Sequence, residues 1–281
     1  MKKIEADYFI TRHSKPGKGV EDSPGLSEEG VEMAKGRAKA IVELIRNSKS
    51  GSVILFGGVT SAERTRSTMD LYASETEKIL TEESADVSFL KAEEIKALAN
   101  ESGYSSAAKD LVSKINLMPE QKVVIELPLF LKEFSMEKYL YEEDGVTVKQ
   151  GWEELLAKHG KNYSEAVKDW LSDPLLSKSV NPEEMARGCM EGMRRLADFA
   201  QRFLPDRPIT IGFVGHSFLI DVLLTYVANA GKVTTEGFEK LGGDIVNETE
   251  LATIKFDESG NSHLEYRGMD FALNLQPADS A

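Results

Sequence analysis

The chain has 281 residues, of which 34 are Lys or Arg and 47 are Asp or Glu, so its formal net charge is −13. This charge argues against a general nucleic-acid binder, because phosphate backbones are held by clustered cationic side chains. The only cysteine, Cys189, excludes an intrachain disulfide and a cysteine-rich metal site. No stretch reaches the roughly 20 apolar residues of a membrane span, and Asp221 interrupts the most apolar run, 218–228. We therefore expect no nucleic-acid or membrane partner and a cytoplasmic location.

Short apolar runs alternate with amphipathic stretches along the chain. Periodicity predicts strands at 8–10, 52–56, 86–90, 122–127, 208–214, 251–256 and 263–266. It predicts helices at 27–47, 61–80, 105–116, 181–203 and 218–230. Alternating strands and helices favour a mostly parallel sheet that is covered on both faces. We therefore expect an α/β fold: a three-layer α/β/α sandwich with a mostly parallel central sheet, formed by residues 1–281 as a single domain.

Two of the four histidines directly follow predicted strands. His13 comes after the strand at 8–10, and His216 comes after the strand at 208–214. A single histidine after a strand is more often structural than catalytic, but two at the same end of a parallel sheet lie where such sheets bind ligands. His159 lies at a helix C-terminus and His263 in a predicted hairpin, so we expect both at the surface. His13 and His216 are therefore candidate site residues.

Two arginines occupy positions that a purely structural role explains poorly. Arg12 precedes His13 at the strand end, and Arg64 lies in the first turn of the helix at 61–80, where the helix dipole disfavours a cation. An anion bound near that helix N-terminus would offset the mismatch. Arg66 follows two residues later, roughly 200° around the helix, so we expect it to face away from a site that Arg64 serves.

Four segments, in chain order, resemble the motifs of one known family. Residues 9–14 (FITRHS) are similar to the Arg-His-Gly signature of the histidine phosphatase superfamily, in its phosphoglycerate mutase-like branch 1. Residues 26–34 resemble that family's Leu-Thr-x-x-Gly-x-x-Gln-Ala helix start, and residues 60–68 (TSAERTRST) resemble its Ser-Pro-x-x-Arg-Ala-x-x-Thr segment. Residues 214–220 resemble its Ser/Gly-His-Gly-x-x-Ile segment. Four motifs in the right order are far more specific than any one of them.

The resemblance implies phosphoryl transfer through a phosphohistidine. It gives His13 the role of nucleophile, and it gives Arg12, Arg64 and His216 the role of binding the transferred phosphoryl group, with His216 also in the catalytic set. The two arginines supply permanently charged planar donors to the phosphoryl oxygens. Because these cations form the clamp, we expect neither a metal ion nor another cofactor.

An acid must protonate the leaving oxygen and then deprotonate the water that breaks the phosphohistidine. Glu133 lies beyond the strand at 122–127 and matches the family's Leu-x-Glu segment, so the resemblance favours it as the third catalytic residue. Glu126, inside that strand, and Glu137, in a polar segment, are the alternatives.

The chain departs from the family's pattern at several positions. Ser14 replaces the usual glycine, where its hydroxyl either binds phosphate or fills space, and Ser61 replaces the usual proline. Residues 15–19 lack the Glu-Ser-x-Trp-Asn continuation that the mutases carry. The long separation of Arg64 from Glu133 predicts an insertion at about 80–121, and 135–180 corresponds to a second, helical insertion over the active site.

The missing mutase continuation favours a phosphatase. The resemblance implies a phosphoric monoester hydrolase of the histidine acid phosphatase type, which would act on a small phosphorylated molecule or a phosphoprotein. Two alternatives stay open: a mutase that returns the phosphoryl group to its substrate, and a non-catalytic regulatory or binding protein on the same fold. No sequence pattern indicates the oligomeric state.

Overall fold

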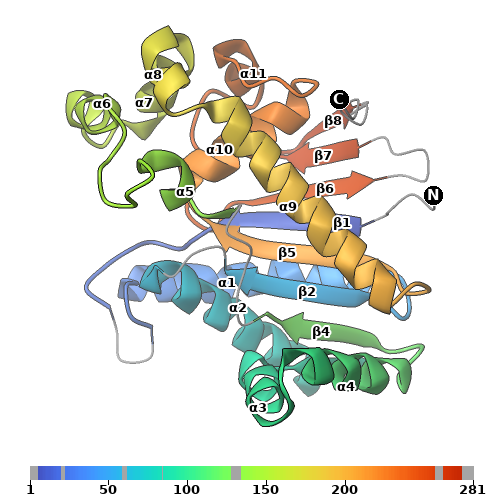
Figure 1. Cartoon of the computed structure of the whole chain (residues 1–281). Helices are drawn as coiled ribbons and strands as arrows, with labels where there is room; N and C mark the ends of the chain where they lie inside the picture. Colours follow the sequence, from blue (N-terminus) through green and yellow to red (C-terminus); the bar gives the residue numbers. More distant parts are fainter. Residues whose placement is uncertain are drawn as a thin grey trace.

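One eight-stranded sheet forms the centre of the computed structural model, which describes residues 6–19, 23–58, 62–83, 85–127, 134–256 and 262–273 (Figure 1). The strands are β1 (Ala6–Arg12), β2 (Val53–Gly58), β3 (Val87–Leu90), β4 (Lys122–Glu126), β5 (Ile209–Gly215), β6 (Leu251–Phe256), β7 (Ser262–Tyr266) and β8 (Met269–Leu273). They lie in the order β3-β4-β2-β5-β1-β6-β7-β8. The first five strands of this order are parallel, and β6, β7 and β8 add an antiparallel meander beside β1.

Helices cover both faces of the sheet, as the alternation of elements predicts. They are α1 (Glu28–Asn47), α2 (Glu63–Glu82), α3 (Ala92–Ser102), α4 (Tyr104–Asn116), α5 (Glu137–Leu140), α6 (Trp152–His159), α7 (Tyr163–Ser172), α8 (Pro174–Ser179), α9 (Pro182–Phe203), α10 (Ser217–Ala228) and α11 (Thr235–Lys240). Figure 1 shows α9 crossing one face, with α1 and α2 on the other. The three-layer α/β/α expectation is confirmed.

The alternation of side chains along β1 divides the core between the two layers. Phe9 packs in the cluster that α1 and α2 share, whereas Tyr8 and Ile10 belong to the larger cluster that includes α9 and α10. Successive side chains of a strand point to opposite faces, so an apolar run without polar breaks is what a strand buried on both faces requires. No helix among the described residues is long and apolar enough to cross a membrane.

Helix α1 begins as its sequence predicts. The Ser27 hydroxyl accepts a hydrogen bond from the Gly30 N–H at 3.1 Å, and Glu28 and Glu29 lie in the first turn. A Cβ at Gly30 would lie 2.3 Å from the Lys15 carbonyl oxygen, so only glycine allows α1 to approach the segment after β1 this closely. The motif glycine therefore fixes the position of the loop that follows His13.

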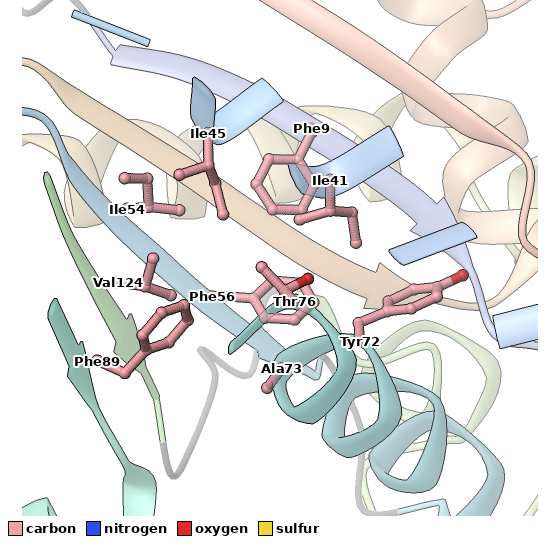
Figure 2. Close-up of a pocket in the computed structure, with 10 residues that line it drawn as sticks. All are labelled: Phe9, Ile41, Ile45, Ile54, Phe56, Tyr72, Ala73, Thr76, Phe89 and Val124. Atoms are coloured by element: carbon pink, nitrogen blue, oxygen red, sulfur yellow. The ribbon is translucent and has the colours of Figure 1, made fainter. Parts of the chain in front are cut away.

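A small cavity lies between α1, α2 and the sheet (Figure 2). Its volume is about 10 Å³, and its walls are mostly aliphatic and aromatic side chains such as Phe9, Phe56 and Tyr72. The hydroxyl of Thr76 in the same wall has no hydrogen-bond partner among the described residues. A cavity of this size has room for about one water molecule, so it belongs to the core and is not a ligand site.

Candidate active site

His13 and His216 are neighbours at the carboxyl edge of the sheet. Strands β1 and β5 pair in parallel register with Arg12 opposite Gly215, and the His13 N–H extends the ladder by donating to the Gly215 carbonyl at 2.9 Å. His216 follows as the N-cap residue of α10. The two imidazole rings lie 5.1 Å apart between centroids, at an angle of 69°. Backbone pairing, rather than loop conformation, therefore sets the spacing of the two histidines.

The hydrogen bonds of His13 define its tautomer. Arg64 Nε donates to His13 Nε2 at 3.2 Å, so Nε2 carries a lone pair. The other ring nitrogen, Nδ1, lies 2.8 Å from the Ser14 carbonyl oxygen and therefore carries the proton that this oxygen accepts. A neutral imidazole with its lone pair on Nε2, oriented by a carbonyl on Nδ1, is arranged as a nucleophile.

The surroundings of His13 keep its ring neutral. The pKa of His13 is lowered to about 3, chiefly by burial and also by the positive charges that His216, Arg12 and Arg64 can carry, while the hydrogen bond to the Ser14 carbonyl opposes the shift. His13 is 5% exposed. Desolvation disfavours the imidazolium form, so the lone pair on Nε2 is present throughout the neutral and mildly acidic range.

Arg64 links the two histidines from the first turn of α2. Its Nε contacts His13, and its Nη2 lies 3.5 Å from His216 Nδ1. The helix begins after Ala62, which makes no side-chain capping bond. Arg66, two residues on, is exposed. The two arginines therefore serve different surroundings, as their angular separation on the helix predicts.

Arg12 is held from the segment 244–250, which leads into β6. Its Nη1 donates to the Val246 carbonyl at 2.8 Å, and its Nη2 lies 3.3 Å from Glu248 Oε1. Its Nε is buried without a hydrogen-bond partner among the described residues. A buried guanidinium nitrogen without an acceptor is costly, and an oxygen of a bound anion is the kind of partner that would satisfy it.

Ser14 has a structural role in this arrangement. Its hydroxyl donates to the Gly30 carbonyl at 2.6 Å, and its backbone N–H donates to Thr68 Oγ1 at 2.9 Å. The Thr68 hydroxyl in turn donates to the Arg64 carbonyl at 2.7 Å. Of the two roles considered for Ser14, these contacts favour filling space beside α1. Ser14 and Thr68 together connect the His13 loop to the helix that carries Arg64.

The three candidate acids differ in what the structure shows of them. Glu133 lies outside the described residues, and so does the side chain of Glu137. Glu126 ends β4, where the Ala92 N–H donates to its carboxylate at 3.5 Å. Burial raises the pKa of Glu126, with Asp70, Glu93 and Lys91 as the charged neighbours. None of these neighbours is a candidate site residue, so the Glu126 carboxyl belongs to the α3 edge of the sheet.

The remaining predicted surface histidines have partners away from the site. His159 ends α6 and lies 2.7 Å from Asp169, and His263 lies 3.5 Å from Asp270. Within the described part of the chain, no group of three or more His, Cys, Asp or Glu side chains is placed to hold a metal ion.

Asp221 is connected to the candidate site through Val246, and the sequence analysis does not identify it as a site residue. It lies on α10, is 2% exposed, and its Oδ1 accepts the Val246 N–H at 2.8 Å. Burial raises its pKa to about 8, against the Val246 hydrogen bond and the charges of Arg12 and Arg267. The signal was present, because a lone acid in an otherwise apolar run must find a polar partner when it is buried.

The comparisons with known proteins return solved structures only. No family model and no curated protein matches the chain. A mycobacterial glucosyl-3-phosphoglycerate phosphatase in complex with VO3 is 14% identical, with a TM-score of 0.46 over 92% of this chain and 97% of that chain. The alpha-ribazole phosphatase from Shigella flexneri is 12% identical, with a TM-score of 0.44 over 96% and 100%. A phosphoglycerate mutase from Plasmodium falciparum is 13% identical, with a TM-score of 0.31 over 95% and 97%.

The TM-scores of these structural similarities are below 0.5, so any inference about function has to come from the geometry around His13. The chain resembles the histidine phosphatase superfamily in its four motifs, and phosphatases and a phosphoglycerate mutase are among the solved structures to which it is similar.

Proposed function

We propose that the protein is a phosphomonoester phosphatase that works through a phosphohistidine on His13 without a metal ion. The observation that carries the proposal is the neutral His13 ring, whose Nε2 lone pair faces Arg64 while the Ser14 carbonyl holds the proton on Nδ1. Beside it lie His216 and the buried Nε of Arg12. A nucleophile surrounded by cationic donors fits a phosphate monoester, whose reacting group is an anion.

The first step forms a bond between His13 Nε2 and phosphorus while the phosphorus–oxygen ester bond breaks. The leaving oxygen takes a proton from the acid and departs as an alcohol. In the second step a water attacks phosphorus, the phosphorus–nitrogen bond breaks, and the acid's carboxylate accepts the water proton. Inorganic phosphate leaves, and His13 returns to its neutral form with the acid protonated.

The cationic side chains act on the phosphoryl group in both steps. Arg64 Nε, which donates to His13 in the structure, turns its N–H to a phosphoryl oxygen when substrate is bound, so the lone pair of His13 becomes available to phosphorus. Arg12 and His216 supply further donors. Negative charge on the equatorial oxygens is stabilised by cationic donors that the fold holds beside His13, which is the main contribution a protein makes to this reaction.

Glu133 is our proposed acid. Replacing Glu133 by glutamine is expected to slow phosphoryl transfer from alkyl phosphates much more than from p-nitrophenyl phosphate, because a good leaving group departs without a proton. Single-turnover kinetics measure the step, since the same residue also activates the water. Glu126→Gln is the matched control, because its carboxyl contacts α3. The assignment is wrong if Glu126→Gln or Glu137→Gln shows the leaving-group dependence and Glu133→Gln does not.

Release of inorganic phosphate tests the function itself. A panel of phosphorylated metabolites and phosphopeptides, with p-nitrophenyl phosphate as the general substrate, should yield phosphate and no isomerised monoester. Activity should survive exhaustive EDTA treatment, because the described candidate site residues are arginines and histidines rather than the carboxylates that Mg²⁺ or Mn²⁺ prefers. Isomer formation from a phosphoglycerate would favour the mutase, no turnover of any substrate would favour the binding protein, and Mg²⁺- or Zn²⁺-restored activity would contradict metal independence.

A further inference from the structure

The Arg12 guanidinium has two partners among the described residues, and only one of them is shielded from solvent. Its Nη2 partner, Glu248, is about one-third exposed, so solvent weakens that ion pair. Its Nη1 partner is the carbonyl of Val246, a buried residue, at 2.8 Å. The position of the guanidinium therefore depends chiefly on the Val246 peptide.

The Val246 backbone is itself held by Asp221. The Asp221 Oδ1 accepts the Val246 N–H at 2.8 Å, so the two polar backbone groups of one residue connect a carboxyl on α10 to a guanidinium on β1. The second oxygen of Asp221 is buried with no hydrogen-bond partner among the described residues. Arg12 lies close enough for its charge to act on the carboxyl. The cost of burying this acid on an apolar helix is thus offset at Val246 and by Arg12.

The segment around Val246 is fastened at both of its ends. The Thr249 N–H donates to the Arg12 carbonyl at 3.2 Å, and Arg267 holds the carbonyls of Asp244 and Ile245 at 3.0 and 2.9 Å. Thr249 has a φ of 59°, a left-handed conformation that is unusual for a β-branched residue. A strained residue persists only where its surroundings hold it, so the segment is built to keep one geometry against Arg12.

We propose that Asp221 is a positioning residue, which sets the Arg12 guanidinium for phosphate through the Val246 backbone. The inference rests on the proposed function in that Arg12 is taken to bind the phosphoryl group. Asp221 itself touches neither substrate nor the reacting atoms. Its effect reaches the reaction because a guanidinium that is fixed beforehand loses less entropy when it binds an anion.

Two replacements remove the anchor, and two others serve as controls. Asp221→Leu keeps the branched shape and the number of side-chain heavy atoms and removes the acceptor. Asp221→Ser is too short to reach Val246, and it provides the test if the leucine variant does not fold. Asp221→Asn retains an amide oxygen for the Val246 N–H and should rescue. Thr225→Val is the matched control, because Thr225 is equally buried one turn along α10 and donates to the Asp221 backbone carbonyl at 2.7 Å rather than to the Val246 segment.

The first measurement needs no ligand. The Arg12 Nε–H signal of ¹⁵N-labelled protein, assigned by its loss in Arg12→Ala, should broaden or disappear through faster exchange with water in Asp221→Leu and Asp221→Ser. It should persist in Asp221→Asn and Thr225→Val. An Arg12 signal that is unchanged in the leucine or serine variant would overturn the proposal.

The second measurement is the affinity for inorganic phosphate by calorimetry. We expect the dissociation constant to rise about tenfold in Asp221→Leu and Asp221→Ser, and to stay within about threefold of wild type in Asp221→Asn and Thr225→Val. In an Arg12→Ala background, Asp221→Leu should add no further loss, which is the signature of action through Arg12. An equal loss in both backgrounds would overturn the proposal. Wild-type protein that binds no phosphate while the Arg12 signal still responds to Asp221 would contradict the proposed function and leave the positioning role supported.

Discussion

Replacing His13 by alanine is expected to abolish turnover of every phosphomonoester and, with it, the covalent intermediate. In wild-type protein, rapid quenching with ³²P-labelled substrate should trap a phosphoenzyme that is labile in acid and stable in base, as a phosphorus–nitrogen bond is. The trapped species should be absent from His13→Ala, because the proposed mechanism forms the phosphorus–nitrogen bond on His13 Nε2, whose lone pair is set by the proton that the Ser14 carbonyl holds on Nδ1.

His159→Ala is the matched control for this result. His159 also pairs with a neighbouring group, Asp169, but it lies on α6, outside the site. The His159→Ala variant should retain wild-type turnover and form the same trapped phosphoenzyme. Near-normal activity in a folded His13→Ala protein would contradict the mechanism, whatever the activity of His159→Ala.

Replacing Arg64 by alanine is expected to raise the barrier of the chemical step by about 3 kcal/mol or more, as loss of a preorganised oxyanion donor does. Arg64 contacts both histidines, so in the proposed mechanism it lies where charge develops on the transferred group. Because its donors strengthen as negative charge builds on the phosphoryl oxygens, its loss should lower kcat more than it raises KM. Pre-steady-state rates of phosphoenzyme formation measure this directly.

Arg66→Ala provides the comparison within the same helix turn. Its side chain is exposed, whereas Arg64 is the arginine that contacts His13 and His216, so removal of Arg66 should change the rate of phosphoenzyme formation by less than threefold. The two variants remove the same charge from α2 and therefore separate a direct donor from the general field of the protein. A larger loss in Arg66→Ala than in Arg64→Ala would place the phosphoryl group on a different side of the helix.

The helices and strands that could be predicted are those that their own residues mark, through an apolar run or a capping side chain. The apolar runs of β1, β2, β4 and β5 are buried on both faces, so their hydrophobicity alone indicated strands. Helices α1 and α9 have capping residues, Ser27 and Asn181, that bind their first-turn N–H groups. By contrast, α3 begins at Ala92 after Lys91, an N-cap residue that makes no side-chain capping bond, and β8 exists through its pairing with β7, so the sequence analysis predicts neither.

In the candidate site, too, local sequence locates some residues and only the tertiary structure shows the others. His13, His216 and Arg64 follow strand ends or open a helix, and such positions can be located from local sequence. The partners of Arg12 could not be located in this way, because Val246 acts through its backbone and Asp221 hydrogen-bonds to Val246 rather than to Arg12. A backbone carbonyl carries no sequence signature, and the pairing of α10 with the 244–250 segment depends on tertiary structure.

The parallel pairing of β1 with β5 also has a consequence for how the site comes into being. The register that places Arg12 opposite Gly215 brings His13 beside His216, so two residues that lie far apart in the sequence become neighbours. Closing so long a loop carries an entropy cost that local contacts do not offset, and such pairings form late and slowly. On the proposed function, competence to bind phosphate is therefore a late event of folding, because strand β5 must insert between β2 and β1 before His13 and His216 become neighbours. Regain of activity after denaturation thus reports completion of the central sheet rather than formation of its helices.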